Sequence, residues 1–419
     1  MRILYTLFIR LYTLLLRLAS VRSEKARQWL KGRRNWQQKL EEAVETSGRG
    51  EMLVWFHVSS LGEFEQGRPV IEAFRKRWPG RNILLTFFSP SGYEIRKNYD
   101  QADIVCYLPA DTPGNVNRFL DIVRPGMIFF VKYDFWFNYI HAIHQREIPL
   151  YYLSALFRPG QHFFRWYGGW FRKHLRMASH YFVQNAESQE LLQKTGITGV
   201  TLTGDTRFDR VFEIALHPKP LPLVERFCQG KPLLVMGSSW EPDEAVCAPL
   251  IRRAGPDLKV IVAPHDTSPG RIRSIREQLC MPATLLSGLT EENAGSADIL
   301  VIDSVGLLSQ LYRFATVAFI GGGFGAGIHN IQEPVTFGVP VLFGPRFGKF
   351  REACDLVALG GAFAVNTPQE AEEKVMRLFD DSEAHRRASE VCRRYVEENR
   401  GATEKVIRFL EPVSTSRQP

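Results

Sequence analysis

The chain has 419 residues, more than the roughly 250–300 that one hydrophobic core supports, so we expect two domains. Hydrophobic residues make up 45% of it and charged residues 23%, which excludes a disordered chain, a collagen-like chain, a coiled coil and a polytopic membrane protein. The formal charge of +8 is local, because residues 1–40 hold ten Lys and Arg against one Glu and the rest of the chain sums to −1. This distribution indicates contact with an anionic surface at one end and argues against a nucleic-acid groove.

The cysteines are spread thinly and form no C-x-x-C pair. We therefore expect reduced core residues in a cytosolic compartment, with neither a disulfide framework nor a zinc site. The six are Cys106, Cys228, Cys247, Cys280, Cys354 and Cys392.

Residues 1–21 predict an amphipathic helix. At about 100° per residue its polar side chains fall within an arc of roughly 80°, and the remaining side chains are apolar. The polar positions are Arg2, Thr6, Arg10, Thr13, Arg17 and Ser20. The arginines exclude both a bilayer span of about 20 apolar residues and a secretory signal.

We therefore expect this helix to lie in a membrane interface with its arginines at anionic headgroups. The basic stretch 22–39 is expected to add electrostatic attraction, and its Trp29 and Trp36 to add interfacial aromatic rings. The alternative is a surface helix packed on its own domain, which explains the apolar face but not the concentrated positive charge.

From residue 52 onward short β-rich runs alternate with amphipathic stretches, a pattern typical of parallel α/β sheets. The first set of predicted strands is 52–58, 82–88, 103–108, 126–131, 149–153, 180–184 and 199–203. The helices expected between them are 63–77, 91–99, 112–123, 136–146 and 186–195. These elements define a first domain over 22–216, and the Pro-bearing segment 217–232 is interpreted as a linker.

The alternation restarts in a second domain over 233–380. Its predicted strands are 233–236, 259–263, 298–302, 316–320, 339–343 and 362–365. Its predicted helices are 241–253, 269–279, 304–313, 331–337, 351–358 and 368–379. The last segment, 381–419, is expected to be a charged helix over about 381–411 that reaches back towards the first domain, and a tail. Two such domains bind ligands in a cleft between the carboxyl ends of their strands.

The sequence HVSSLGE directly follows the first predicted strand and ends at Glu63. A carboxylate at the start of the next helix complements the helix dipole, which is sufficient to explain it structurally. The functional interpretation is a general base that takes a proton from an attacking hydroxyl. The lone glutamate does not decide between the two.

The glycine-rich run 321–327 also follows a strand, but it fits the dinucleotide-binding pattern poorly because no acidic residue ends a strand about twenty positions later. We interpret it as a loop whose amides approach phosphate oxygens, or else as a tight turn. Next along the chain, Asn330 and Glu333 fit a capping box, and the same helix start is suited to hold a phosphate while Glu333 binds ribose hydroxyls.

Three further segments are ambiguous. The strand-end sequences 237–240 and 263–266 are each interpreted as a turn in preference to a binding site. Arg207 is compatible with a structural salt bridge or with a phosphate clamp.

Taken together, the motifs resemble those of 3-deoxy-D-manno-octulosonic acid (Kdo) transferases. The matching segments are HVSSLGE at 57–63, SPSG at 89–92, KYDFWFN at 132–138, TGDTRFD at 203–209, GSS at 237–239, IDSVGLLSQLY at 302–312 and IHNIQEPVTFGVPVLFGP at 328–345. The resemblance covers almost the whole chain, and the S-x-G-E loop and the H-N-x-x-E-P block are its specific parts.

The resemblance implies a glycosyltransferase of GT-B architecture, α/β, with two Rossmann-like domains and an interdomain cleft. It implies metal-independent, inverting transfer of Kdo from CMP-Kdo to a lipid A precursor at the cytoplasmic face of the inner membrane, with no cofactor. Glu63 matches the catalytic base. The implied acceptor-binding residues are Ser60, Gly62, Ser89, Ser91, Asp134 and Arg207. The implied nucleotide-sugar-binding residues are Ser238, Pro264, His265, Gly322, Gly323, Gly325, Asn330 and Glu333.

The chain departs from the family pattern at three places. The family's E-T-E-x-W-P-N begins here with Lys132, so its first acid is lost and its second is Asp134. Its P-R-H reads Pro264, His265, Asp266, and its A-R-L reads Ala155, Leu156, Phe157. Two alternatives remain: a soluble nucleotide-sugar 2-epimerase of the same architecture, and a non-enzymatic scaffold at the membrane periphery.

Overall fold

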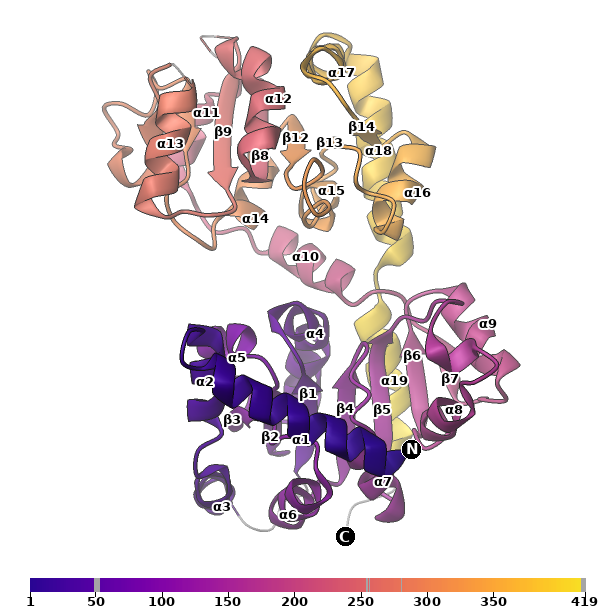
Figure 1. The fold of residues 1–419 in the computed structure, drawn as a ribbon. Coiled ribbons are helices and arrows are strands. Elements are labelled where there is room, and N and C mark those ends of the chain that lie inside the picture. Colours follow the sequence, from indigo (N-terminus) through magenta and orange to yellow (C-terminus); the bar gives the residue numbers. More distant parts are fainter. Residues whose placement is uncertain (49–52, 254, 256, 280, 416–419) are drawn as a thin grey trace. The chain divides into compact units, whose positions relative to one another are not determined.

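The computed structural model describes residues 1–48, 53–253, 255, 257–279 and 281–415. The chain divides into two compact units (Figure 1). The first unit comprises Met1–Asp209 and Gly401–Pro419, and the second comprises Arg210–Arg400. Each unit is a parallel sheet flanked by helices, as the alternating pattern predicted.

The first unit contains a seven-stranded sheet in the order β3-β2-β1-β4-β5-β6-β7, with every neighbouring pair parallel. Its strands are β1 (Val54–Val58), β2 (Ile83–Phe87), β3 (Ile104–Tyr107), β4 (Met127–Val131), β5 (Leu150–Ala155), β6 (His180–Val183) and β7 (Val200–Leu202). The central strands β1, β2 and β4 are buried along their whole length because both faces of a parallel sheet are covered by helices.

The first unit's helices include one from the far end of the chain. They are α1 (Arg2–Ala19), α2 (Glu24–Gly32), α3 (Trp36–Thr46), α4 (Leu61–Arg77), α5 (Pro90–Arg96), α6 (Pro113–Val123), α7 (Phe137–Gln145), α8 (Gly169–Leu175), α9 (Ala186–Lys194) and α19 (Ala402–Thr415). Helix α19 packs beside α4 and buries Val406 and Leu410 in the core on that side of the sheet.

The second unit repeats the plan with the sheet order β10-β11-β9-β8-β12-β13-β14, again parallel. Its strands are β8 (Leu233–Ser239), β9 (Lys259–Pro264), β10 (Thr284–Leu285), β11 (Ile299–Val301), β12 (Val317–Ile320), β13 (Val341–Phe343) and β14 (Ala362–Ala364). Its helices are α11 (Pro222–Cys228), α12 (Glu241–Arg252), α13 (Pro269–Leu279), α14 (Leu308–Leu311), α15 (Gln332–Thr336), α16 (Arg351–Leu359), α17 (Pro368–Asp380) and α18 (Ser382–Asn399). Helix α10 (Arg207–Leu216) begins before the division between the units and ends after it.

Two predicted segments differ from the structure. The segment 217–232, for which no helix was predicted, contains helix α11, which begins at Pro222 and buries Val224 and Phe227. The single helix predicted over 381–411 is two helices, α18 and α19. The break falls at Gly401, whose φ of 92° lies in the left-handed region that ends helices.

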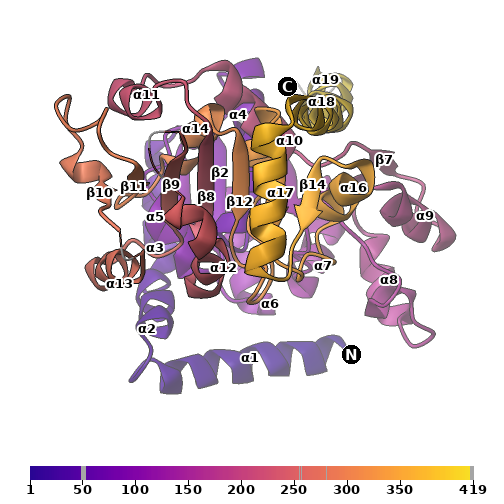
Figure 2. The same cartoon turned by 90° about the horizontal axis from the view of Figure 1, so that it is seen from above.

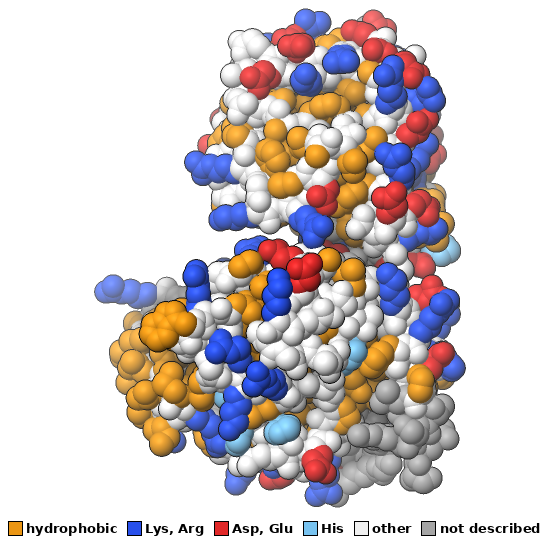
Figure 3. Space-filling view, turned by 90° about the vertical axis from the view of Figure 1, so that its right-hand side faces the viewer, with side chains coloured by type: hydrophobic (Ala, Val, Ile, Leu, Met, Phe, Trp, Pro, Cys, Tyr) orange, Lys and Arg blue, Asp and Glu red, His pale blue; other side chains and the backbone are white. Residues whose placement is uncertain are grey.

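Helix α1 turns Tyr5, Thr6 and Ile9 towards the first unit, while its arginines and most of its apolar side chains face outward. Tyr5 Oη donates to the Asp111 carboxylate at 2.7 Å, and Ile9 is buried. Figure 2 shows α1 lying across one side of the unit. Its exposed apolar side chains are Ile3, Leu4, Leu7, Phe8, Leu11, Leu14, Leu15 and Leu18. In the space-filling view, hydrophobic side chains gather at the lower left, over the first unit (Figure 3). None of the helices in the described part of the chain has both the length and the apolarity needed to cross a bilayer.

The expectation that Trp29 and Trp36 are interfacial is wrong for Trp29, which is only 5% exposed. The Arg33 guanidinium carbon lies 3.8 Å from the centre of the Trp29 ring, and Arg33 donates to the carbonyl oxygens of Leu108 and Phe88. Burial lowers the pKa of Arg33 to about 9. Trp36 is half-buried against Phe119. This part of the basic stretch therefore attaches the helices to the domain.

The five described cysteines are all free. Cys228, Cys247 and Cys392 are buried as predicted, whereas Cys106 and Cys354 are only half-buried. Cys280 lies outside the described residues.

Candidate active site

The predicted site residues follow strands at the point where each sheet's strand order reverses. In the first sheet β1 and β4 are neighbours, with β2 and β3 on one side and β5 to β7 on the other. In the second sheet β8 and β12 hold the same position. Ligands of open parallel sheets bind at the carboxyl ends of the strands beside such a switch point. Glu63 and Asp134 follow the first pair of strands, and the loop 321–327 follows β12.

Glu63 lies in the first turn of α4, directly after β1. Its side chain is half-buried, and the Ser60 hydroxyl donates to its carboxylate. Ser60 stands at the N-cap in an extended conformation, so the chain turns from strand to helix within two residues. This arrangement orients a carboxylate that solvent still reaches, which is the requirement for a general base.

Asp134 lies behind this loop. Its Oδ1 accepts a hydrogen bond from Ser59 Oγ at 2.5 Å, while its Oδ2 is buried without a hydrogen-bond partner. The pKa of Asp134 is raised to about 8, mainly by burial, with the bond from Ser59 opposing the rise and the nearby Glu63 adding to it. The arrangement favours a role in holding the loop 59–63 over direct contact with an acceptor.

His57, which lies on β1, is a neighbour of Asp134, with 3.5 Å between His57 Nε2 and Asp134 Oδ2. His57 Nε2 accepts from the Trp136 indole at 2.9 Å, so it carries no proton, and Nδ1 faces Thr86 Oγ1 at 2.8 Å. Burial lowers the pKa of His57 to about 3. The pair is therefore not an ion pair, because burial favours the neutral form of both groups.

Arg207 forms the structural salt bridge that was one of its two interpretations. Its Nε and Nη2 donate to Asp205 Oδ2 at 2.9 and 2.6 Å. Partial burial acts to raise the pKa of Asp205, but Arg207 and then Lys132 hold it below the ordinary value. Lys132, which replaces a family carboxylate, therefore acts on Asp205 as a second cation. Burial raises the pKa of Tyr133, the next residue along the chain, although the cations Arg158 and Arg207 act to lower it.

The remaining first-unit predictions lie on the same edge of the sheet. Ser89 follows β2, and its backbone N–H donates to the Ser59 carbonyl at 2.8 Å. Its hydroxyl caps α5 and lies 2.9 Å from the Ser91 hydroxyl. Gly62 is exposed in the first turn of α4. The structure thus brings Ser60, Gly62, Glu63, Ser89 and Asp134 to one place, with Asp134 the innermost.

In the second unit, the loop 321–327 folds on itself more tightly than a phosphate cradle requires. The Gly322 N–H donates to Asp243 Oδ2 at 2.9 Å. The N–H groups of Gly325 and Gly327 donate to the Gly322 carbonyl at 2.9 and 3.1 Å. These three N–H groups are already hydrogen-bonded within the protein, so fewer backbone N–H groups of the loop remain to bind a phosphate. Gly323 lies in the same loop.

Asn330 and Glu333 do not form the expected capping box. Helix α15 begins only at Gln332 and has Ile331 as its N-cap. Asn330 Oδ1 accepts from the Gln332 N–H at 3.0 Å, and Asn330 Nδ2 donates to Glu333 Oε1 at 3.2 Å. With five residues, α15 is too short to provide a strong helix dipole, so side chains rather than the dipole distinguish this loop.

Three rings stack over the carboxyl ends of β8, β9 and β12. The ring centres of Trp240 and His265 are 4.7 Å apart, and those of His265 and His329 are 4.5 Å apart. Trp240 Nε1 donates to His329 Nε2 at 3.1 Å, so the proton of neutral His329 is on Nδ1. Burial lowers the pKa of His329, and His265 lowers it further.

The stack lies beside the other predicted nucleotide-sugar residues. The His265 N–H donates to the Ser239 carbonyl, next to Ser238, and Pro264 ends β9 opposite Ser239. The His329 N–H donates to the Gly321 carbonyl at 3.1 Å. The structure therefore brings Ser238, Pro264, His265 and the loop 321–330 together.

Sequence reasoning missed the acidic pair that supports this site. Asp243 binds the N–H groups of Trp240 and Gly322 and so connects the loops after β8 and β12. Glu244 accepts from Ser239 Oγ at 2.7 Å and from Arg271 Nη2 at 2.6 Å, with both charged side chains nearly buried. The sequence signal was the acidic start of α12, which reads equally well as ordinary helix capping.

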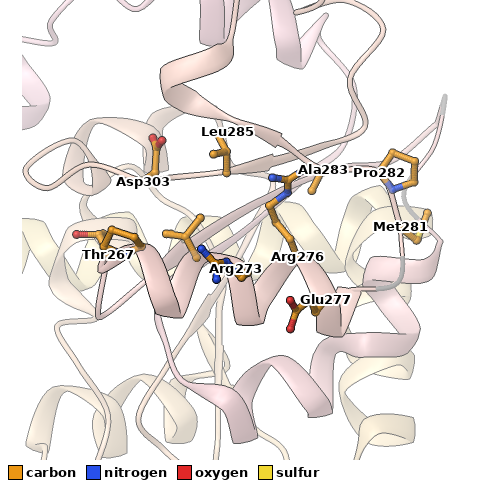
Figure 4. A pocket seen from close by; sticks show the side chains of 11 residues that line it. Thr267, Arg273, Arg276, Glu277, Met281, Pro282, Ala283, Leu285 and Asp303 are labelled. Carbon is orange, nitrogen blue, oxygen red and sulfur yellow. The ribbon is translucent and has the colours of Figure 1, made fainter.

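A cavity of about 610 Å³ lies between α13 and the segment 281–285. Arg276 projects from α13 towards Ala283 and Leu285, and Asp303 lies at one end (Figure 4). None of the predicted site residues lines it. Within the described residues, no group of three or more His, Cys, Asp and Glu side chains could hold a metal ion.

Known structures share this fold. A putative UDP-N-acetylglucosamine 2-epimerase from Listeria monocytogenes superimposes with a TM-score of 0.61 at 14% identity, over 88% of this chain and 98% of that one. The UDP-GlcNAc 2-epimerase from Neisseria meningitidis, solved with UDP-GlcNAc, gives 0.60 at 17% identity, over 86% and 99%. At such identities the likeness shows the fold alone, and it confirms a GT-B-like α/β protein with two Rossmann-like domains.

Sequence comparisons are more specific. The family model of 3-deoxy-D-manno-octulosonic-acid transferase (kdotransferase) matches residues 33–210. The 3-deoxy-D-manno-octulosonic acid transferase of Haemophilus influenzae is 25% identical over 378 residues, 86% of each chain. That of Bordetella pertussis is 27% identical over 379 residues, 85% of this chain and 86% of its own. The resemblance carried by the motifs is confirmed: this chain is a relative of the Kdo transferases, glycosyltransferases of lipopolysaccharide biosynthesis.

Proposed function

We propose that this chain transfers Kdo from CMP-Kdo to a lipid A precursor, with Glu63 as the general base. The acceptor hydroxyl oxygen bonds to the anomeric carbon of Kdo as the bond from that carbon to the CMP phosphate oxygen breaks. Glu63 takes the hydroxyl proton, and CMP leaves with the bonding electrons. One displacement on the opposite face inverts the anomeric configuration.

The observation that carries this proposal is the setting of Glu63. Its carboxylate is half-buried after β1 at the switch point of the first sheet, and Ser60 orients it. Asp134, the second carboxyl nearby, has a pKa raised by burial, so it does not compete for the same proton as an anion at neutral pH.

The donor is proposed to bind the second unit. The stack of Trp240, His265 and His329 offers flat rings and the His329 Nδ1–H, and Asn330 and Glu333 offer polar groups for the CMP moiety. Gly323 and the rest of the loop 321–327 would lie against the phosphate. The proposed reaction uses no added metal, so a chelator is expected to leave the rate unchanged.

The test replaces Glu63 by Gln and measures transfer with CMP-Kdo and a tetra-acylated disaccharide acceptor by product mass. Loss of a general base is expected to lower turnover by about 10²–10⁴-fold while CMP still raises the melting temperature. Glu65→Gln on the same helix is the control, because Glu65 pairs with Arg96 and Arg68 instead. Near-normal turnover in Glu63→Gln would remove this residue from the mechanism. Stabilisation by UDP-N-acetylglucosamine and not by CMP would favour an epimerase-like enzyme.

We further propose that the protein is peripheral or monotopic on the cytoplasmic side of the inner membrane, held there by residues 1–40. The support is the outward apolar face of α1 beside the exposed arginines Arg2, Arg10 and Arg17. Because Tyr5 fixes α1 to the first unit, point substitutions test this better than a deletion. The double substitution Leu7→Lys and Leu14→Lys is expected to abolish binding to anionic vesicles without lowering the melting temperature. Unchanged binding would refute the anchor.

A further inference from the structure

The loop between β5 and α8 displays two aromatic side chains to solvent. Trp166 is 92% exposed and Tyr167 is 53% exposed. Their ring centres lie 5.7 Å apart in an edge-to-face arrangement. Tryptophan usually buries most of its large apolar surface, so a ring left this open indicates a contact outside the chain.

The loop is built to hold this display in place. Arg172 Nη1 donates to the carbonyl oxygens of Phe163 and Arg165 at 3.0 and 2.8 Å, and Phe163 itself is buried. At Gly168 a Cβ atom would lie 2.0 Å from the His162 carbonyl oxygen, so only glycine permits this close turn. The exposure of Trp166 is therefore a feature of a folded loop and not of a loose one.

Along the chain, the charged residues of the loop and its flanks have one sign. Residues 148–186 contain no Asp or Glu and five Lys or Arg. Arg158, Arg165 and Lys173 are exposed, whereas Arg172 is the residue that closes the loop. An exposed indole flanked by exposed cations is typical of segments that lie in the headgroup layer of an anionic membrane.

The loop lies next to the start of α1. The Tyr5 ring centre is 6.3 Å from that of Trp170 on α8 and 5.1 Å from that of Phe137 on α7. Both ribbon views place the N-terminal end of α1 beside α8 (Figures 1 and 2). The outward apolar face of α1 and the aromatic loop thus belong to one packed unit.

We propose that residues 158–173 form a second contact with an anionic bilayer, in which Trp166 and Tyr167 enter the headgroup layer and the flanking cations bind lipid phosphates. The contact extends the proposed seating of α1 and rests on it. Two contacts that are separate along the chain fix how the first unit is oriented on the membrane, which a single helix lying in the interface does not.

The test measures co-sedimentation of the full chain with phosphatidylethanolamine vesicles containing phosphatidylglycerol. Trp166→Ser with Tyr167→Ser is expected to weaken binding roughly tenfold. Trp166→Phe with Tyr167→Phe should restore most of it, because the rings remain. Leu359→Ser on α16, an exposed leucine of the second unit, is the matched control and should leave binding unchanged. Brominated phosphatidylglycerol should quench less tryptophan fluorescence in Trp166→Phe than in the unaltered protein.

Further outcomes separate this inference from the proposed function. The serine variant should transfer Kdo normally to a detergent-dispersed acceptor and poorly to one embedded in vesicles. If the α1 variant loses vesicle binding while the serine variant binds as well as the unaltered protein, the second contact is overturned and the anchor stays intact. A change in oligomeric state without vesicles, with vesicle binding unchanged, would assign the surface to a second copy of the chain and would also overturn it.

Discussion

The carboxyl group of Asp134 is buried, where a charged carboxylate is costly, and one of its oxygens accepts a hydrogen bond from Ser59. Both facts are consistent with a neutral carboxylic acid, which keeps one oxygen free to accept. The sequence identifies Asp134 as a substitute for a family carboxylate, but its protonation depends on burial, which only the fold reveals.

This assignment predicts how stability depends on pH. The folded-state pKa of Asp134 is raised to about 8, above its ordinary value of 3.8, so the folded state holds the proton more tightly than the unfolded one. The stabilising contribution is fully present below about pH 4 and is lost as pH rises through about 8. Asp134→Asn should remove this slope, as measured by urea unfolding between pH 5 and 9.

The same variant separates a supporting role from a direct one. Asparagine keeps an acceptor for Ser59, so Asp134→Asn should retain transfer activity within a few-fold and Asp134→Ala should not. If the free energy of unfolding of Asp134→Asn still falls towards alkaline pH with the same slope as that of the unaltered protein, the assignment of a neutral Asp134 is contradicted.

At the scale of elements, the strands are the best-predicted part of the fold. Short apolar runs such as that of β4 are typical of buried strands, and turn residues mark their ends. The loops after β1 and β12 were also located, because Gly, Ser and Glu at strand ends form a local signal. Helix α11 and the break at Gly401 were missed, since both depend on which surface the segment packs against.

The orientation of α1 shows the same limit. Its amphipathic pattern identifies two faces but not what each one contacts. The polar arc, expected at lipid headgroups, instead faces the first unit in part, where Thr6 bonds with Asn138. The aromatic residues predicted to be interfacial were chosen by their nearness to this helix in sequence, whereas Trp166, which is 92% exposed, lies far along the chain.

Helix α19 gives a prediction at this scale, because it completes the core of a unit formed mostly by the other end of the chain. Leu410 is fully buried with Val406 among side chains from β1, β2 and α4. Leu410→Ala should lower the free energy of unfolding of the first unit by about 2–5 kcal/mol. Arg408→Ala, at an exposed position of the same helix, should change it by no more than about 0.5 kcal/mol. Denaturant unfolding followed by tryptophan fluorescence measures both, and equal effects would mean that α19 is not part of this core.

At the scale of the whole molecule, the two units repeat one topology with different side chains at the switch point. The first carries carboxyl groups and serines, and the second carries rings, glycines and an amide. Acidic side chains occur in both units, but in the second unit Asp243 binds backbone amides and Glu244 is paired with Arg271. The flat rings and the His329 Nδ1–H are what suit this unit to a nucleotide. The division of chemistry therefore supports an acceptor on the first unit and a donor on the second.

This division can be tested without turnover, by hydrogen exchange with CMP present. At a CMP concentration of about 100 times its Kd, binding should stabilise the second unit by about 2.7 kcal/mol. Protection should appear in peptides covering 237–243 and 321–333, whose loops Asp243 joins, and not in 57–63 or 132–138. UDP at the same concentration is the control and should protect less. Protection confined to the first-unit peptides would reverse the roles of the two units, because the nucleotide would then bind beside Glu63 and leave that carboxylate no place for an acceptor hydroxyl.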